Sequence, residues 1–134
     1  MTKATEEEYL RVIYYLKNQK GLVRTSDLAD YLKISKAGVS EMMQSLSSRG
    51  LVKIQSYSPV NLTKKGLILA RKMTFKHRVL ETFLSKKLGF PENKIHEEAS
   101  LLEHAASDEM INKLYSFLGK PKKDPHGKPI VPLK

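Results

Sequence analysis

Apolar residues recur every three or four positions along most of this chain, and glycines or short polar runs separate the periodic stretches. This pattern predicts a largely helical protein. The longest helices are predicted over residues 5–20, 36–49 and 63–88. A shorter helix is expected between the first two, and two more are expected after Pro91 and after Ser107.

The start of the first helix matches a capping box, because Thr5 is followed three residues later by Glu8. In that motif the Glu8 carboxylate accepts a hydrogen bond from the backbone N–H of Thr5. The motif therefore explains Glu8 without any ligand. For the shorter second helix, Thr25 or Ser26 is the expected N-cap.

Residues 25–52 place two helices and a brief turn at the spacing of a helix-turn-helix, in which Ser35 caps the recognition helix 36–49. Alternation in residues 51–55 and a short return in residues 60–62 predict a β-hairpin, so the motif reads as a winged helix. A generic helical bundle with a hairpin is the alternative. The candidate DNA contacts are Ser35, Lys36, Ala37, Gly38, Ser40, Glu41 and Gln44 on the helix and Tyr57 at the wing tip.

The predicted fold is mainly α with a small β-hairpin wing, and it has three parts. Residues 1–72 form an N-terminal winged helix-turn-helix, residues 73–119 a C-terminal helical domain, and residues 120–134 an extended basic tail rich in Pro and Lys. The apolar faces of the later helices exceed what one small lobe can bury. We therefore expect the C-terminal domain to form a homodimer interface.

The net charge of +10 is concentrated in the first 75 residues and in the tail, whereas residues 76–119 are close to neutral. A basic front half favours nucleic-acid binding over a surface charged only for solubility. With no cysteine, any metal must be bound by nitrogen and oxygen ligands. The start is acidic and polar, and no apolar run approaches the roughly 18 residues of a membrane span, so we expect a soluble cytoplasmic protein.

Three of the four histidines fall on predicted helical faces next to carboxylates. His77 continues the apolar seam of helix 63–88 and has Glu81 one turn beyond it, so it is either a satisfied core histidine or a metal ligand. Read as a continuous helix, residues 96–108 bring four polar residues to one side, as either a solvated face or a metal-binding edge. These four residues are His96, Ser100, Glu103 and His104. We assign no function to the fourth histidine, His126.

Motifs of catalysis are absent from the sequence. His96 and Glu97 do not continue into HExxH, and there is no nucleophile elbow or glycine-rich phosphate loop. We therefore do not expect an enzyme.

Together these segments resemble the diphtheria-toxin-repressor family of metal-dependent transcription factors, which includes the manganese transport regulators. The resemblance rests on EEYLRVIYYL near the start, the helix-turn-helix from Asp27 to Val52, NLTKKG after the wing, FKHRVLETFL at 75–84 and IHEEASLLEHAASDE at 95–109. It covers nearly the whole chain. It implies a winged-helix domain joined to a helical dimerisation domain with divalent metal between them, as in members without a third, SH3-like domain.

The resemblance also implies a ligand set. The matching positions are His77, Glu81, His96, Glu103 and His104, with Glu8 at the position of a first-helix ligand. Two positions depart from the family. Ser100 stands where the family has a cysteine or a glutamate, so its side chain is lost or weakened as a ligand. Arg11 stands where one manganese-regulator subgroup has a glutamate ligand, so that subgroup's binuclear arrangement is doubtful here.

The expected function is metal-dependent repression of metal-uptake genes, with Mn²⁺ or Fe²⁺ orienting a homodimer on a palindromic operator in double-stranded DNA. Mn²⁺ is the first choice because the ligands are nitrogen and oxygen without thiolate, although Co²⁺, Ni²⁺ or Zn²⁺ could bind in vitro. The alternative is a metal-independent winged-helix or architectural DNA-binding protein in which the histidines are structural.

Overall fold

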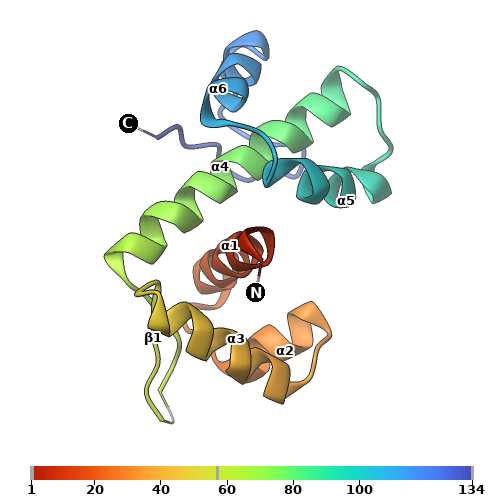
Figure 1. The fold of residues 1–134 in the computed structure, drawn as a ribbon. Coiled ribbons are helices and arrows are strands. Elements are labelled where there is room, and N and C mark those ends of the chain that lie inside the picture. Colours follow the sequence, from red (N-terminus) through yellow and green to blue (C-terminus); the bar gives the residue numbers. More distant parts are fainter. Residues whose placement is uncertain (1, 57, 134) are drawn as a thin grey trace. The chain divides into compact units, whose positions relative to one another are not determined.

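The computed structural model describes residues 2–56 and 58–133, in which six helices and one two-stranded sheet form (Figure 1). The elements are α1 (Lys3–Lys20), α2 (Thr25–Leu32), α3 (Lys36–Ser48), β1 (Val52–Lys53), β2 (Asn61–Leu62), α4 (Lys64–Lys86), α5 (Glu92–Glu103) and α6 (Asp108–Phe117). The predicted fold class, mainly α with a small β-hairpin, is confirmed. The chain divides into two compact units between Arg71 and Lys72, and α4 runs from the end of the first into the second.

In the first unit, α1, α2 and α3 enclose an apolar core, and the hairpin follows α3. The most deeply buried side chains of this core include Leu10, Ile13, Leu28, Val39, Met43 and Leu46. The two strands are antiparallel, with Val52 opposite Leu62. The backbone N–H of Val60 donates to the carbonyl of Val23 at 2.7 Å, which ties the hairpin to the loop between α1 and α2. This is the arrangement of a winged helix.

The cap predicted for α3 is confirmed, because the Ser35 hydroxyl accepts from the backbone N–H of Gly38 at 3.0 Å. The predicted cap of α1 is wrong. The helix begins earlier, and the hydroxyl of Thr2 accepts from the N–H of Thr5 at 3.1 Å, so Thr5 is already inside the first turn and its N–H is not available to Glu8.

The predicted cap of α2 is also wrong. The N-cap is Arg24, whose backbone N–H donates to the carboxylate of Asp27 at 2.8 Å. Asp27, in the first turn, therefore accepts the hydrogen bond at the start of the helix, and neither Thr25 nor Ser26 is the N-cap. Lys20 donates to the same carboxylate at 2.6 Å, and these two hydrogen bonds lower the pKa of Asp27 below its ordinary value.

The first turn of α4 packs closely against the chain that leaves α3. Gly66 is the contact residue, and an ideal Cβ at this position would overlap the carbonyl oxygen of Leu51 and lie 2.9 Å from its carbonyl carbon. Because the obstacle is backbone, it cannot rotate away. Glycine is required here by space, not by its backbone angles.

Replacing Gly66 with alanine is therefore expected to lower the free energy of unfolding by about 1–3 kcal/mol, the usual cost of forcing atoms into a filled site. The higher helix propensity of alanine opposes this by at most about 1 kcal/mol. Urea unfolding followed by circular dichroism measures the difference. Lys64→Ala, at an exposed position of the same helical turn, is the control and should stay within about 0.5 kcal/mol of wild type. An unchanged urea midpoint for Gly66→Ala would contradict the predicted contact.

In the second unit, the later part of α4, α5 and α6 surround a smaller core. Its buried members are Phe75, Val79, Leu80, Leu84, Ala99, Ile111 and Ile130. The continuous helix predicted over residues 96–108 is wrong, because α5 ends at Glu103 with His104 as its C-cap. Ser107 then caps α6 as predicted, and its hydroxyl accepts from the N–H of Met110 at 3.0 Å.

The segment after α6 has no helix or strand in its described residues, but side-chain contacts anchor it to the second unit. Ile130 is buried in the core, and Arg78 on α4 donates to the carbonyl of Pro129 at 2.7 Å. One oxygen of the buried carboxylate of Asp124 accepts from the backbone N–H groups of His126 and Lys128, at 2.9 and 2.8 Å. This turn fixes the backbone of the segment next to α4.

None of the helices in the described part of the chain combines the length and the apolar character that a membrane crossing needs.

Candidate functional site

His77 lies in the interior of the second unit, on the buried side of α4. Its Nδ1 donates to Oε1 of Glu103 at 2.5 Å, and the Glu103 side chain is fully buried. A carboxylate that accepts from one imidazole nitrogen fixes the orientation of the ring and directs the other nitrogen. His77 is thus buried, as its place in the apolar seam of the helix predicted, but its ring contacts polar side chains.

The second nitrogen of His77 faces two further atoms that could bind a metal ion. Its Nε2 lies 3.1 Å from Nδ1 of His96 and 3.4 Å from Oε2 of Glu81, and His96 Nδ1 lies 3.8 Å from the same Glu81 oxygen. Nitrogen and oxygen ligands bind a divalent ion at about 2.1 Å, so two ligands of one ion lie about 3–4 Å apart. All three distances fall in that range. The donor set of His77, Glu81 and His96 therefore fits a metal ion.

Glu81 also belongs to a second group of possible metal ligands, which we did not predict from the sequence. Asp124 and His126 bring their ligand atoms into one group with Glu81, and Nδ1 of His126 lies 3.7 Å from Oε2 of Glu81. His126 was assigned no function because the Pro- and Lys-rich segment was read as an extended tail. The signal that could have found it is Asp124, which is placed to accept from following backbone N–H groups and form a turn.

The Glu81 carboxylate belongs to both groups. Burial raises its pKa, but hydrogen bonds from His77 and His96 and the nearby charges of His77 and His126 lower the pKa well below its ordinary value. Glu81 is therefore ionised at neutral pH. An ionised carboxylate at this position attracts a divalent cation, which imidazole nitrogens can bind only when they carry no proton.

The remaining predicted ligands are distributed differently. His104 is half-buried just after α5, and its Nε2 lies 3.7 Å from Oε2 of Glu103. Ser100 is half-buried on α5 and belongs to neither donor group found among the described residues. Glu8 lies partly buried on α1 in the first unit. The ligand roles of these four residues stay predictions.

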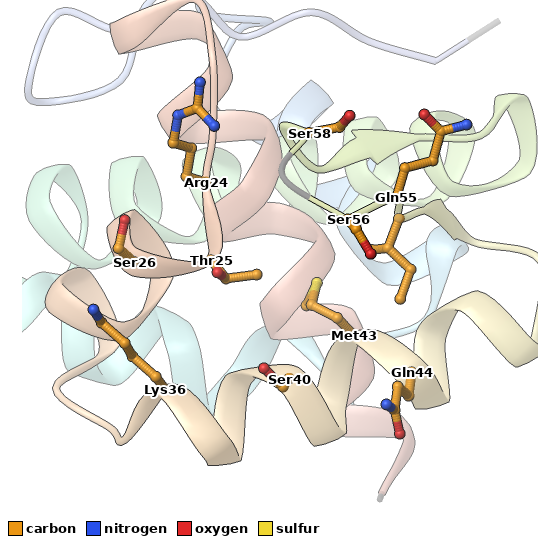
Figure 2. Close-up of a pocket in the computed structure, with 11 residues that line it drawn as sticks. Arg24, Thr25, Ser26, Lys36, Ser40, Met43, Gln44, Gln55, Ser56 and Ser58 are labelled. Carbon is orange, nitrogen blue, oxygen red and sulfur yellow. The ribbon is translucent and has the colours of Figure 1, made fainter.

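A groove of about 590 Å³, lined mostly by polar residues, lies on the first unit between α2, α3 and the wing (Figure 2). Three of the residues predicted to contact DNA line it, namely Lys36, Ser40 and Gln44. The start of α2 forms another wall, with Arg24, Thr25 and Ser26, and the wing contributes Ile54, Gln55, Ser56 and Ser58.

The sequence missed the wall formed by the start of α2 because Thr25 and Ser26 were interpreted as caps. Two cations and several hydroxyl and amide groups around one groove suit a sugar–phosphate backbone. The other predicted contacts described by the structure do not line the groove, namely Ser35, which is the N-cap of α3, and Ala37, Gly38 and Glu41 on α3. Tyr57 lies outside the described residues.

Comparison with known proteins gives two family models that match successive parts of the chain. The model described as "Iron dependent repressor, N-terminal DNA binding domain" matches residues 1–60. The model described as "Iron dependent repressor, metal binding and dimerisation domain" matches residues 63–132.

Individual proteins are similar over most of this chain. An uncharacterised HTH-type transcriptional regulator of Methanocaldococcus jannaschii is 38% identical over 115 residues, which are 85% of this chain and 92% of that protein. The diphtheria toxin repressor of Corynebacterium diphtheriae is 34% identical over 129 residues, 96% of this chain and 57% of that protein. A solved manganese-dependent transcriptional repressor in complex with manganese has a TM-score of 0.86 and 38% identity, and the match covers 95% of this chain and 58% of that one. This chain thus spans less than two thirds of the length of the last two.

Proposed function

This chain belongs to the iron-dependent repressor family, as its motifs predicted, and we propose that it is a metal-dependent transcriptional repressor that binds operator DNA as a homodimer. The observation that carries the proposal is the convergence of His77, Glu81 and His96 at metal-ligand distances in one unit of a chain whose other unit is a winged helix.

The metal-binding part of the proposal rests on the chemistry of the donors. His77, Glu81 and His96 would hold a divalent ion, and Asp124 and His126 extend the same cluster through Glu81. When bound, the ion would supply the positive charge that holds imidazole and carboxylate groups of α4, α5 and the C-terminal segment together. Donors without sulfur suit Mn²⁺ or Fe²⁺, while Co²⁺, Ni²⁺ or Zn²⁺ could bind in vitro. The solved relatives include one named as a complex with manganese and one with bound Zn²⁺.

The DNA-binding part rests on α3 and the groove beside it. A recognition helix with small residues at its start can approach base edges, while Arg24 and Lys36 contact phosphates. The matching C-terminal family model is described as a dimerisation domain, which supports a two-fold dimer. Such a dimer would read two half-sites of a palindrome about 34 Å apart. We place this activity in the cytoplasm and on genes of metal uptake.

Selection from random double-stranded DNA with the purified full chain tests the function. In excess Mn²⁺ we expect an inverted repeat to be enriched, and fluorescence anisotropy on that repeat should show affinity at least about tenfold higher with Mn²⁺ than with EDTA. Equal affinity in Mn²⁺ and EDTA would refute the metal-dependent function. It would favour the alternative, a metal-independent DNA-binding protein. The observation that supports this alternative is the buried hydrogen bond between His77 and Glu103, because it gives His77 a purely structural role. Isothermal titration calorimetry of Mn²⁺ separates the two further, because the alternative predicts no stoichiometric binding.

A further inference from the structure

Glu41 is an exception in the charge distribution of the DNA-binding unit. It is the only acidic residue between Lys33 and Lys72. The other charged residues within that range are all basic: Lys36, Arg49, Lys53, Lys64, Lys65 and Arg71. Glu41 is exposed on α3, and in the part of the chain that the structure describes it forms no ion pair. Its carboxylate is therefore available to a ligand and is not used to stabilise the fold.

The position of Glu41 on α3 directs it away from the core. The buried side of α3 consists of Val39, Met43 and Leu46. With about 100° between successive residues, Glu41 and Gln44 lie on the opposite side of the helix. Residues 35–40 before them are small apart from Lys36 and the buried Val39, so nothing long shields Glu41 from a groove of DNA.

The groove beside α3 indicates which part of the DNA the outward face of α3 would meet. Figure 2 shows Ser40 and Gln44 one turn apart on α3, with Arg24, Thr25 and Ser26 across the groove. If phosphates are held at Arg24 and Lys36, the outward face of α3 meets the base edges. Phosphates repel a carboxylate, and hydrogen bonds that it accepts from the bases offset this repulsion. In the major groove, only the amino groups of cytosine and adenine donate, and adenine places an acceptor, N7, beside its amino group.

We propose that Glu41 reads cytosine, accepting a hydrogen bond from its N4 amino group in each half-site of the operator. Cytosine is the only base whose own major-groove edge offers a donor and no acceptor, so it is the base that a carboxylate prefers. Gln44, the other long side chain on this face, reads a nearby position. This inference rests on the proposed function and adds the base that the recognition helix selects.

The experiment compares the full wild-type chain with Glu41→Gln in random-sequence selection, both loaded with Mn²⁺. Wild type should enrich one cytosine per half-site, and replacing that cytosine with thymine should weaken binding by about fivefold or more in anisotropy titrations. Glu41→Gln should lose this preference and shift to adenine, because the amide can both donate to N7 and accept from N6. Asp30→Asn removes another exposed carboxylate of the same unit, on α2, and should leave the selected sequence unchanged.

Two results would overturn the inference while leaving the proposed function intact. One is selection of the same base by wild type and Glu41→Gln. The other is tighter binding of Glu41→Gln to all sequences by one common factor, which would make Glu41 only a source of repulsion. If wild type selects no sequence in Mn²⁺ or in EDTA, the proposed function itself fails, and the base assignment fails with it.

Discussion

Replacing Glu81 with glutamine is expected to lower the affinity for Mn²⁺ by at least about 100-fold and to remove metal-stimulated DNA binding. Loss of an outer partner of a metal ligand already costs about 10–100-fold, and Glu81 is an anionic donor in both groups. The amide has nearly the same shape but no charge. Its N–H₂ group can also donate to the imidazole nitrogens that a metal needs. The change therefore acts on metal affinity more than on packing.

Isothermal titration calorimetry and DNA anisotropy measure this effect, and circular dichroism checks the fold. Glu97→Gln makes the same chemical change at an exposed position of α5 and should leave metal affinity within about twofold of wild type. Wild-type metal affinity in Glu81→Gln would show that neither donor group binds the regulatory ion.

The two donor groups can be separated by single histidine replacements. His96→Ala removes a donor only from the group with His77, and His126→Ala removes a donor only from the group with Asp124. If both groups bind metal, each variant should lose affinity in one of two phases of the titration. A loss confined to His96→Ala would restrict the site to α4 and α5.

The sequence predicted the helices well where a short side chain marks their starts. Ser35 and Ser107 were identified as caps because each is a good N-cap residue and directly precedes a stretch with an apolar helical face. At the first helix, Thr2 and Thr5 are both possible N-caps, and only the structure shows that the helix begins early enough for Thr2 to be the cap. The end of α5 carried no signal, since Ala105 and Ala106 are good helix formers.

Of the contacts in the metal-binding cluster, the sequence predicts only those between residues one helical turn apart. His77 and Glu81 are one turn apart on α4, so their proximity follows from the sequence. The distance from Glu81 to His126 depends instead on a turn at Asp124 and on the burial of Ile130. Contacts this far apart in the chain leave no periodic pattern, and a segment rich in Pro and Lys does not resemble a folded one.

Replacing His77 with alanine is expected to destabilise the metal-free protein by about 3–5 kcal/mol, the cost of removing one partner of a buried ion pair. The Glu103 carboxylate is fully buried and would lose the N–H that donates to it at 2.5 Å. Glu103→Ala should cost less, about 1–3 kcal/mol, because it removes the buried carboxylate itself and leaves only the N–H of His77 without this acceptor. The double variant should be more stable than the sum of the two losses implies, by at least about 1 kcal/mol. Urea unfolding in EDTA measures all three, with His126→Ala as a histidine control on the surface of the cluster.

The same variants show whether His77 binds metal or only completes the core. A hundredfold excess of Mn²⁺ over its dissociation constant stabilises a protein by about 2.7 kcal/mol when the ion binds the folded state alone. Wild type should gain this stability when Mn²⁺ replaces EDTA. His77→Ala should lose the part of the gain that comes from the group with Glu81 and His96, because its Nε2 faced both. A purely structural histidine predicts a different result, in which His77→Ala is less stable in EDTA but gains as much from Mn²⁺ as wild type does. That result would remove His77 from the ligand set while leaving its hydrogen bond to Glu103 as the reason for its burial.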